Sequence, residues 1–159
     1  MIHLLPYLEG SIKSEKSPEE IARILKSITD SQKSLLRRDT KAEFTGEVTP
    51  AGFKVVSNIN YRNSFLPVIE GRVRTEEDAS LIEIKMRLHP LVRVFLLFWF
   101  GMVSFFVLLG IADIIMSGFH VALRLFLPAG GLFTLAYLMV RGGFYLPARK
   151  AMERLENLL

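Results

Sequence analysis

The spacing of hydrophobic residues changes twice along the chain, from a helical period to alternation and then to an unbroken apolar run. Residues 17–38 have the helical period. Ser17 can cap a helix that starts at Pro18, and Glu20 completes a capping box. Two arginines close the segment and suit the negative end of a helix dipole. This part of the chain therefore predicts an amphipathic helix.

Alternation of apolar and polar residues predicts strands in the next part of the chain. It occurs in four runs, at 44–48, 53–61, 69–73 and 82–88. One wet face per strand indicates an antiparallel sheet, whose dry face we expect the helix to cover. If the sheet is a simple meander, the turn "RNSFLP" lies at the same end as residue 88.

The run that follows the fourth strand is apolar on every side. No charged residue occurs between Arg93 and Asp113, and a helix needs about 20 such residues to cross a bilayer. A buried core helix is the alternative. The charged part of the chain, however, offers too little material to surround a helix that is apolar all round. We therefore predict a transmembrane helix.

A second apolar stretch, Val121 to Val140, contains residues that disturb a simple span. Arg124 suits a snorkelling position at the far interface, where Asp113 can pair with it. Pro128 and the pair Gly130 and Gly131 predict a kink or a close approach between two helices. All five are assigned to packing of a helical hairpin, or to a pore if the hairpin conducts.

These elements predict an α+β fold class, with an N-terminal helix packed on a four-stranded antiparallel sheet, a two-helix transmembrane hairpin and a C-terminal amphipathic helix. The predicted domains are residues 1–90, 91–142 and 143–159. Lys and Arg flank the two apolar stretches but are missing from their short connection. The positive-inside rule then predicts a multi-pass protein of the inner (cytoplasmic) membrane, with both termini and the first domain in the cytoplasm.

The last segment, "LPARKAMERLENLL", has one apolar side. Pro147 can start a helix whose apolar side includes Ala151 and Leu155. Such a helix can lie on the membrane surface or pack against the domain. A coiled-coil dimer is a third arrangement, for which only about two heptads are present.

Composition sharpens the division of the chain and limits its chemistry. Residues 1–90 hold 14 of the 20 Lys and Arg and 13 of the 16 Asp and Glu, so a charged domain precedes an apolar one. There is no cysteine, and His3, His89 and His120 lack metal-ligand spacing. No nucleotide-binding loop or nucleophile motif is present. We therefore predict no catalytic residue, metal or cofactor, and we predict that the protein is not an enzyme. The basic residues that flank the membrane segments account for the high pI, so the pI is not evidence for binding to nucleic acid.

The meander places one group of residues beside the predicted membrane surface. This group comprises Arg37, Arg38, Lys41, Arg62, Phe65, Leu66, Arg87 and Arg93. A basic residue near an anionic leaflet contributes about 1 kcal/mol. The apolar pair in the group either touches the interface or fills the core of the domain.

A second group, Lys54, Arg62, Arg72 and Arg74, is assigned to an anionic ligand, with ordinary solubility as the alternative. The predicted function is a membrane-anchored, non-enzymatic binding or scaffold module whose sheet domain binds a partner, a lipid headgroup or a small ligand. The alternative is a membrane-permeabilising effector that oligomerises through the hairpin when the sheet binds an anionic, nucleotide-like signal. The expected partners are a membrane, an anionic lipid or small anionic ligand, and further copies of the chain.

The segment "YRNSFLPVIEGRV", Tyr61 to Val73, followed by "IEIKMRLHP" and an apolar span, resembles a class of small bacterial two-span membrane proteins with a β-rich cytoplasmic domain. The resemblance covers roughly Phe44 to Phe100 and implies no activity, because that class has none established. The overall plan is also similar to that of bacterial proteins with a β-rich domain on a two-helix hairpin. Some of those are membrane effectors triggered by nucleotide second messengers.

Overall fold

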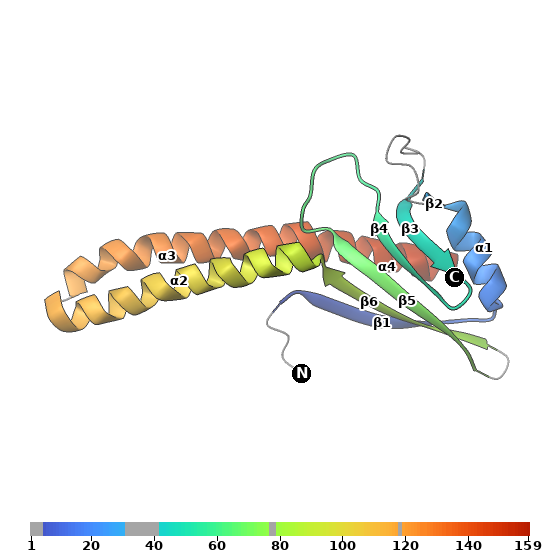
Figure 1. Cartoon of the computed structure of the whole chain (residues 1–159), viewed down its shortest axis with the longest axis horizontal. Helices are drawn as coiled ribbons and strands as arrows, with labels where there is room; N and C mark the ends of the chain where they lie inside the picture. The colour runs from blue at the N-terminus through green and yellow to red at the C-terminus, as the bar shows by residue number, and fades with distance from the viewer. Residues whose placement is uncertain (1–4, 31–41, 77–78, 118) are drawn as a thin grey trace.

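The computed structural model describes residues 5–30, 42–76, 79–117 and 119–159, without the side chains of 117 and 119–125. The elements in chain order are β1 (Tyr7–Ser14), α1 (Pro18–Ser27), β2 (Thr29–Asp30), β3 (Phe44–Thr49), β4 (Gly52–Ser57), β5 (Pro67–Glu76), β6 (Ala79–Leu88), α2 (Pro90–Ser117), α3 (Phe119–Val140), the π-helical turn η1 (Arg141–Tyr145) and α4 (Leu146–Leu158). They form a sheet domain and a long rod of two helices (Figure 1).

The sheet has six strands in the order β1-β6-β5-β4-β3-β2. Strands β3 to β6 form an antiparallel meander, and β1 pairs antiparallel with β6. The sheet is mixed because β2 runs parallel to β3. The four alternating runs of the sequence lie in β3, β4, β5 and β6, but the predicted four-stranded antiparallel sheet was wrong because it lacked β1 and β2.

Strand β1 was missed because its inner face carries small residues. The positions on that face are Leu8, Gly10, Ile12 and Ser14, and only two of them are large and apolar. Gly10 must be small, since an added Cβ would lie 2.9 Å from Cε of Met152 in α4. β2 is two residues long, too short for any alternation to show.

Helix α1 begins as predicted but is shorter. The N–H of Glu20 donates to Oγ of Ser17 at 3.2 Å, which is the predicted cap. The helix is 10 residues long, so the predicted span 17–38 was too long. Ile28 leaves the helical conformation, and its carbonyl accepts a hydrogen bond from the N–H of Phe44. Pairing of the next residues with β3 therefore replaces a further turn of helix.

The core lies between one face of the sheet and the helices α1 and α4. Its fully buried side chains include Ile21, Leu25, Ile69, Ile82, Ile84, Met86, Phe144, Ala148 and Leu155. Helix α4, whose position the sequence left open, packs its apolar side on the sheet. The opposite face of the sheet is not covered by a second layer of described elements (Figure 1).

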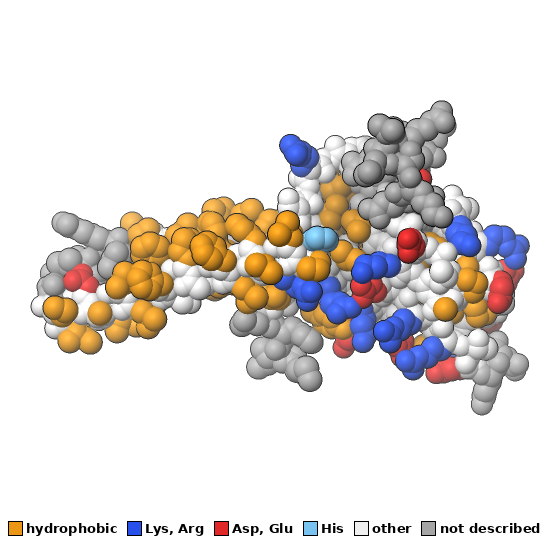
Figure 2. Space-filling view, viewed as in Figure 1, with side chains coloured by type: hydrophobic (Ala, Val, Ile, Leu, Met, Phe, Trp, Pro, Cys, Tyr) orange, Lys and Arg blue, Asp and Glu red, His pale blue; other side chains and the backbone are white. Residues whose placement is uncertain are grey.

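Both helices of the rod continue directly from the domain. One residue, His89, separates β6 from α2, and α3 runs through η1 into α4. The two helices lie side by side over their length (Figure 1). Their buried residues within the described part are Leu96, Val103 and Gly110 of α2 and Ala129 and Ala136 of α3. Their outward side chains are mostly apolar (Figure 2).

The rod corrects the predicted membrane topology. Among the described residues, one helix, Pro90–Met116, is long and apolar enough to cross a membrane. Helix α3 is 22 residues long, but it does not meet the same criterion within the described residues, and Pro128 lies inside it. The structure therefore contradicts the two-helix transmembrane hairpin and, with it, the multi-pass location with both termini in the cytoplasm.

Candidate functional site at the base of the apolar helix

The uncovered face of the sheet carries a ladder of alternating charges. The strand register places Glu47, Lys54, Glu70, Lys85 and Glu9 in one row across β3, β4, β5, β6 and β1. Opposite charges directly across neighbouring strands contribute roughly 0.2–1 kcal/mol per pair. The ladder explains how this face remains soluble without a covering layer, and it presents charged groups to any ligand that lies on it.

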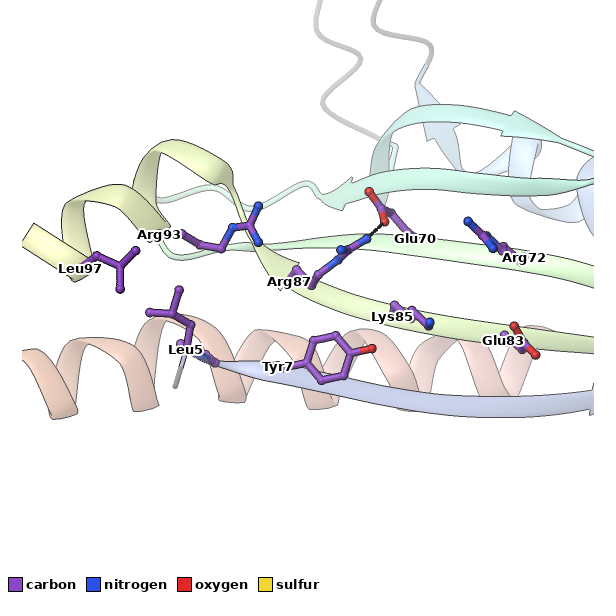
Figure 3. A pocket seen from close by; sticks show the side chains of 10 residues that line it. Leu5, Tyr7, Glu70, Arg72, Glu83, Lys85, Arg87, Arg93 and Leu97 are labelled. Atoms are coloured by element: carbon purple, nitrogen blue, oxygen red, sulfur yellow. Dashed lines mark hydrogen bonds and ion pairs between the residues drawn. The ribbon is translucent and has the colours of Figure 1, made fainter. Parts of the chain in front are cut away.

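A hollow of about 590 Å³ lies on this face, where β1, β5 and β6 meet α2. The charged residues that line it are Arg72, Lys85, Arg87, Arg93, Glu70 and Glu83. Four cations against two carboxylates leave a net charge of 4 − 2 = +2. Figure 3 shows these side chains projecting from the strands and from the first turn of α2. We call this hollow the junction hollow.

The carboxylate of Glu70 is already neutralised inside the junction hollow. Lys54 Nζ lies 3.1 Å from its Oε1, and Arg87 donates to its Oε2. Burial raises the pKa of Glu70, but the hydrogen bonds and charges of these two cations outweigh burial and leave the pKa below its usual value. Glu70 is thus ionised at neutral pH and fixes the position of the Arg87 guanidinium.

The second carboxylate is also paired, and three cations are left over. Oε1 of Glu83 lies 3.5 Å from a guanidinium nitrogen of Arg74, outside the hollow. Arg72, Lys85 and Arg93 form no ion pair with any of the residues that the structure describes. The junction hollow therefore presents three cations outside any ion pair, although the strand register places Arg72 opposite Glu83 and Lys85 between Glu70 and Glu9.

The end of the junction hollow nearest α2 is apolar. Leu5 and Leu97 lie at this end and point toward each other (Figure 3). Beside Leu97 on α2, Val94 and Phe98 are 64% and 71% exposed. The hollow therefore runs from a cationic end on the sheet to an apolar end, and the apolar end continues onto the outer surface of α2.

The structure brings together residues that the sequence assigned to two different groups. Arg72 came from the group for an anionic ligand, and Arg87 and Arg93 from the group at the membrane surface; all three line the junction hollow. Lys54 and Arg74 of the ligand group lie beside it and pair with its carboxylates. Sequence reasoning missed Lys85 and Leu97. Lys85 could have been included, because in the predicted strand it lies on the same solvent-facing side as Arg87.

The other residues of the predicted membrane surface lie elsewhere. Arg37, Arg38 and Lys41 are outside the described residues. Phe65 is buried in the core against Gly143, which is the second of the two positions left open for it. Arg62 and Leu66 line a separate hollow of about 730 Å³ under the loop between β4 and β5.

The residues assigned to hairpin packing or a pore are not gathered at one place. Asp113 is half-buried near the end of α2, and Pro128 is exposed in α3. The side chain of Arg124 is outside the described part. A Cβ added at Gly130 or Gly131 would meet nothing within 4 Å. A close approach is found instead at Gly110, where an added Cβ would lie 3.1 Å from Cζ of Phe126; the role of the glycine pair in a kink stays a prediction.

Within the part of the chain that the structure describes, no group of three His, Asp or Glu side chains is placed to hold a metal ion. Comparisons with protein-family models, with curated proteins and with solved structures give no match. The chemistry of the chain is therefore argued from the geometry of the junction hollow and of the rod.

Proposed function

We propose that the protein is a membrane-anchored, non-enzymatic binding module. Helix α2 enters lipid, and the sheet domain is held at the lipid–water boundary with the junction hollow open to an anionic ligand. The observation that carries this proposal is the outward-facing apolar surface of α2.

The exposure of α2 supports lipid as its surroundings. In its most apolar 18 residues, 17% of the residues are buried. The exposed large side chains of α2 are Leu91, Val94, Phe95, Leu97, Phe98, Phe105, Leu108, Leu109, Ile111, Ile114, Ile115 and Met116. Proteins in water rarely expose so continuous an apolar surface unless it contacts a membrane or a partner. A helix apolar on every side is favoured in lipid.

The connection between the domain and α2 supports a binding role at the boundary. Because β6 and α2 are separated by His89 alone, the strand positions the helix without a flexible linker. Arg93 lies in the first turn of α2, so its guanidinium marks the border between the charged and the apolar region. Leu88, the last residue of β6, is 1% exposed, which anchors this border in the core.

The lining of the junction hollow supports binding rather than a reaction. Its polar side chains are cations, carboxylates already held by cations, and Tyr7. Burial and a hydrogen bond to Glu9 raise the pKa of Tyr7, so this phenol keeps its proton at neutral pH. The described lining thus offers charge and hydrogen bonds to an anion, and no nucleophile paired with a general base.

A charged residue in the middle of α2 tests the proposal. Leu108 of α2 is 64% exposed, and Tyr61 in the loop before β5 is 62% exposed, so the two sites are matched in accessibility. An arginine at the centre of a membrane helix costs about 2.5–3.5 kcal/mol. We expect Leu108→Arg to remove the chain from membranes after an alkaline carbonate wash, while the wild type and Tyr61→Arg stay in the pellet. Release of the wild type by the wash would contradict the proposal.

A further inference from the structure

We propose that the junction hollow binds the phosphate of an anionic glycerophospholipid, with the headgroup on Arg72, Lys85 and Arg93 and an acyl chain leaving past Leu97 along α2. This inference rests on the proposed function and names the ligand class of the same site. It is argued from the charge, the shape and the position of the hollow.

The net positive charge of the hollow favours an anion. Its two carboxylates form ion pairs with Lys54, Arg74 and Arg87, whereas its other three cations form no ion pair with the described residues. Lysine and arginine form short, charge-assisted hydrogen bonds with phosphate oxygens. Glu70 holds the Arg87 guanidinium in place beside these cations. The cations lie in series along the hollow, from Arg72 on β5 through Lys85 on β6 to Arg93 on α2, so an elongated headgroup can contact them (Figure 3).

The shape of the hollow distinguishes an amphiphile from a soluble anion. A soluble phosphate gains nothing from contact with the apolar end formed by Leu5 and Leu97, whereas an acyl chain can pack against these two side chains as it leaves the hollow. The volume of about 590 Å³ lies within the range of small-molecule sites, roughly 300–1,000 Å³. The apolar end includes Leu97 of α2, whose side chain is 48% exposed.

The position of the hollow fits the level of lipid phosphates. Arg93 is three residues after Pro90, the first residue of α2, which corresponds to about 4.5 Å along a helix axis. If α2 enters lipid, this arginine lies at the boundary, while Lys85 and Arg72 lie on the sheet beyond it. A headgroup bound by all three is drawn toward the domain while its acyl chains remain beside α2. Figure 3 shows this sequence of side chains from Leu97 to Arg72.

The test compares lipid retention by the full chain in detergent, measured by native mass spectrometry. The probes are phosphatidylglycerol, phosphatidylcholine with the same acyl chains, and soluble glycerol 3-phosphate. We expect the wild type to retain phosphatidylglycerol in preference to phosphatidylcholine. In Lys85→Gln/Arg93→Gln this preference should fall at least about tenfold, because one charge-assisted hydrogen bond is worth a factor of ten or more. Arg93→Gln alone, outside the sheet, should give a smaller loss in the same direction.

The matched control is Lys13→Gln, which removes an exposed cation from the same face of the sheet outside the hollow. It should leave the preference unchanged. Equal retention of the two lipids by the wild type would overturn the inference, and so would an equal loss in Lys13→Gln. Displacement of the lipid by equimolar glycerol 3-phosphate would also overturn it, because the site would then bind phosphate without needing a lipid. Because lipid retention is measured in detergent, its outcome does not depend on anchoring to a bilayer. Membrane anchoring is tested separately by the carbonate wash.

Discussion

The sheet domain and the rod use the same apolar residue types in opposite ways. In the domain, Leu25, Ile69 and Met86 are 2%, 0% and 0% exposed, whereas Phe98 and Ile115 of the rod are 71% and 82% exposed. Burial of apolar surface stabilises a domain in water, and the same outward surface is unfavourable there. The comparison shows that the chain buries apolar side chains in the domain and leaves them outward on the rod, with the change at a one-residue connection.

The border between the two regions is where binding groups accumulate. The charged face of the sheet ends there, and the apolar surface of α2 begins. Neither region alone would form the junction hollow, because Arg72, Lys85 and Arg87 come from the strands, whereas Arg93 and Leu97 come from α2 (Figure 3). The same type of substitution made in the domain and in the rod tests the contrast between them.

Truncation of a leucine should have the largest effect on stability. Leu155 of α4 is 0% exposed, and Leu127 of α3 is 75% exposed. Leu155→Ala should lower the free energy of unfolding of the domain by about 2–5 kcal/mol, because it removes buried contacts and leaves a cavity. Leu127→Ala should change it by less than about 0.5 kcal/mol. Urea unfolding in detergent, followed by circular dichroism, measures both, and equal effects would remove the proposed contrast.

Addition of one methyl group to a glycine gives the next largest effect. In β5, a Cβ at Gly71 would lie 2.2 Å from the ring of Phe53, so Gly71→Ala should destabilise the domain by about 1–3 kcal/mol. In α2, a Cβ at Gly101 meets nothing within 4 Å. Gly101→Ala should therefore be neutral or stabilise the helix, since alanine is the better helix former. The same unfolding experiment applies, and a stable Gly71→Ala would mean that Phe53 does not pack on the glycine.

The ion pair between Glu43 and Arg154 should give the smallest effect. It is bidentate, with N···O distances of 2.7 and 2.6 Å, but both side chains are more than a third exposed. The hydrogen bond from Arg154 holds the pKa of Glu43 below 4.5 despite some burial. Its stabilising effect is therefore present at neutral pH and is lost as the pH falls below that value.

The measurement for this pair is the difference in unfolding free energy between the wild type and Arg154→Gln at low salt. We expect a small advantage of the wild type at pH 7 that shrinks toward pH 3. The other carboxylates contribute to both proteins and cancel in the difference. An advantage that grows on acidification would show that the lowered pKa of Glu43 is not coupled to folding.

Local pattern was enough to predict the strands of the meander and the apolar helix that follows. The predictions failed where a tertiary contact decides the local sequence. Gly10 and Ser14 sit on the dry face of β1 because α4 lies above Gly10, so the alternation of this strand is incomplete. α1 stops where Ile28 turns to pair with β3. The second span was predicted from its apolar composition although Arg124 and Pro128 were recognised as disturbing it, and Pro128 lies inside a continuous helix α3.

The components of the candidate site were predictable as residue types but not as a site. Arg72, Arg87 and Arg93 were each assigned a cationic role from position in the sequence. Their convergence depends on the register of β5 with β6 and on where α2 leaves the sheet, and neither follows from spacing. In the sequence, Leu97 is one more residue of the apolar run after Arg93, and only the structure places it at the end of the junction hollow (Figure 3).

Trp99 gives the most direct measurement of the surroundings of α2. It is the only tryptophan in the sequence, and in α2 it is half-buried, with Nε1 3.4 Å from the carbonyl oxygen of Leu132. In bilayers that contain the full chain, we predict that bromine on the lipid acyl chains quenches its fluorescence and that aqueous iodide does not. Quenching by iodide without quenching by brominated lipid would place α2 in water and contradict the proposal that α2 enters lipid.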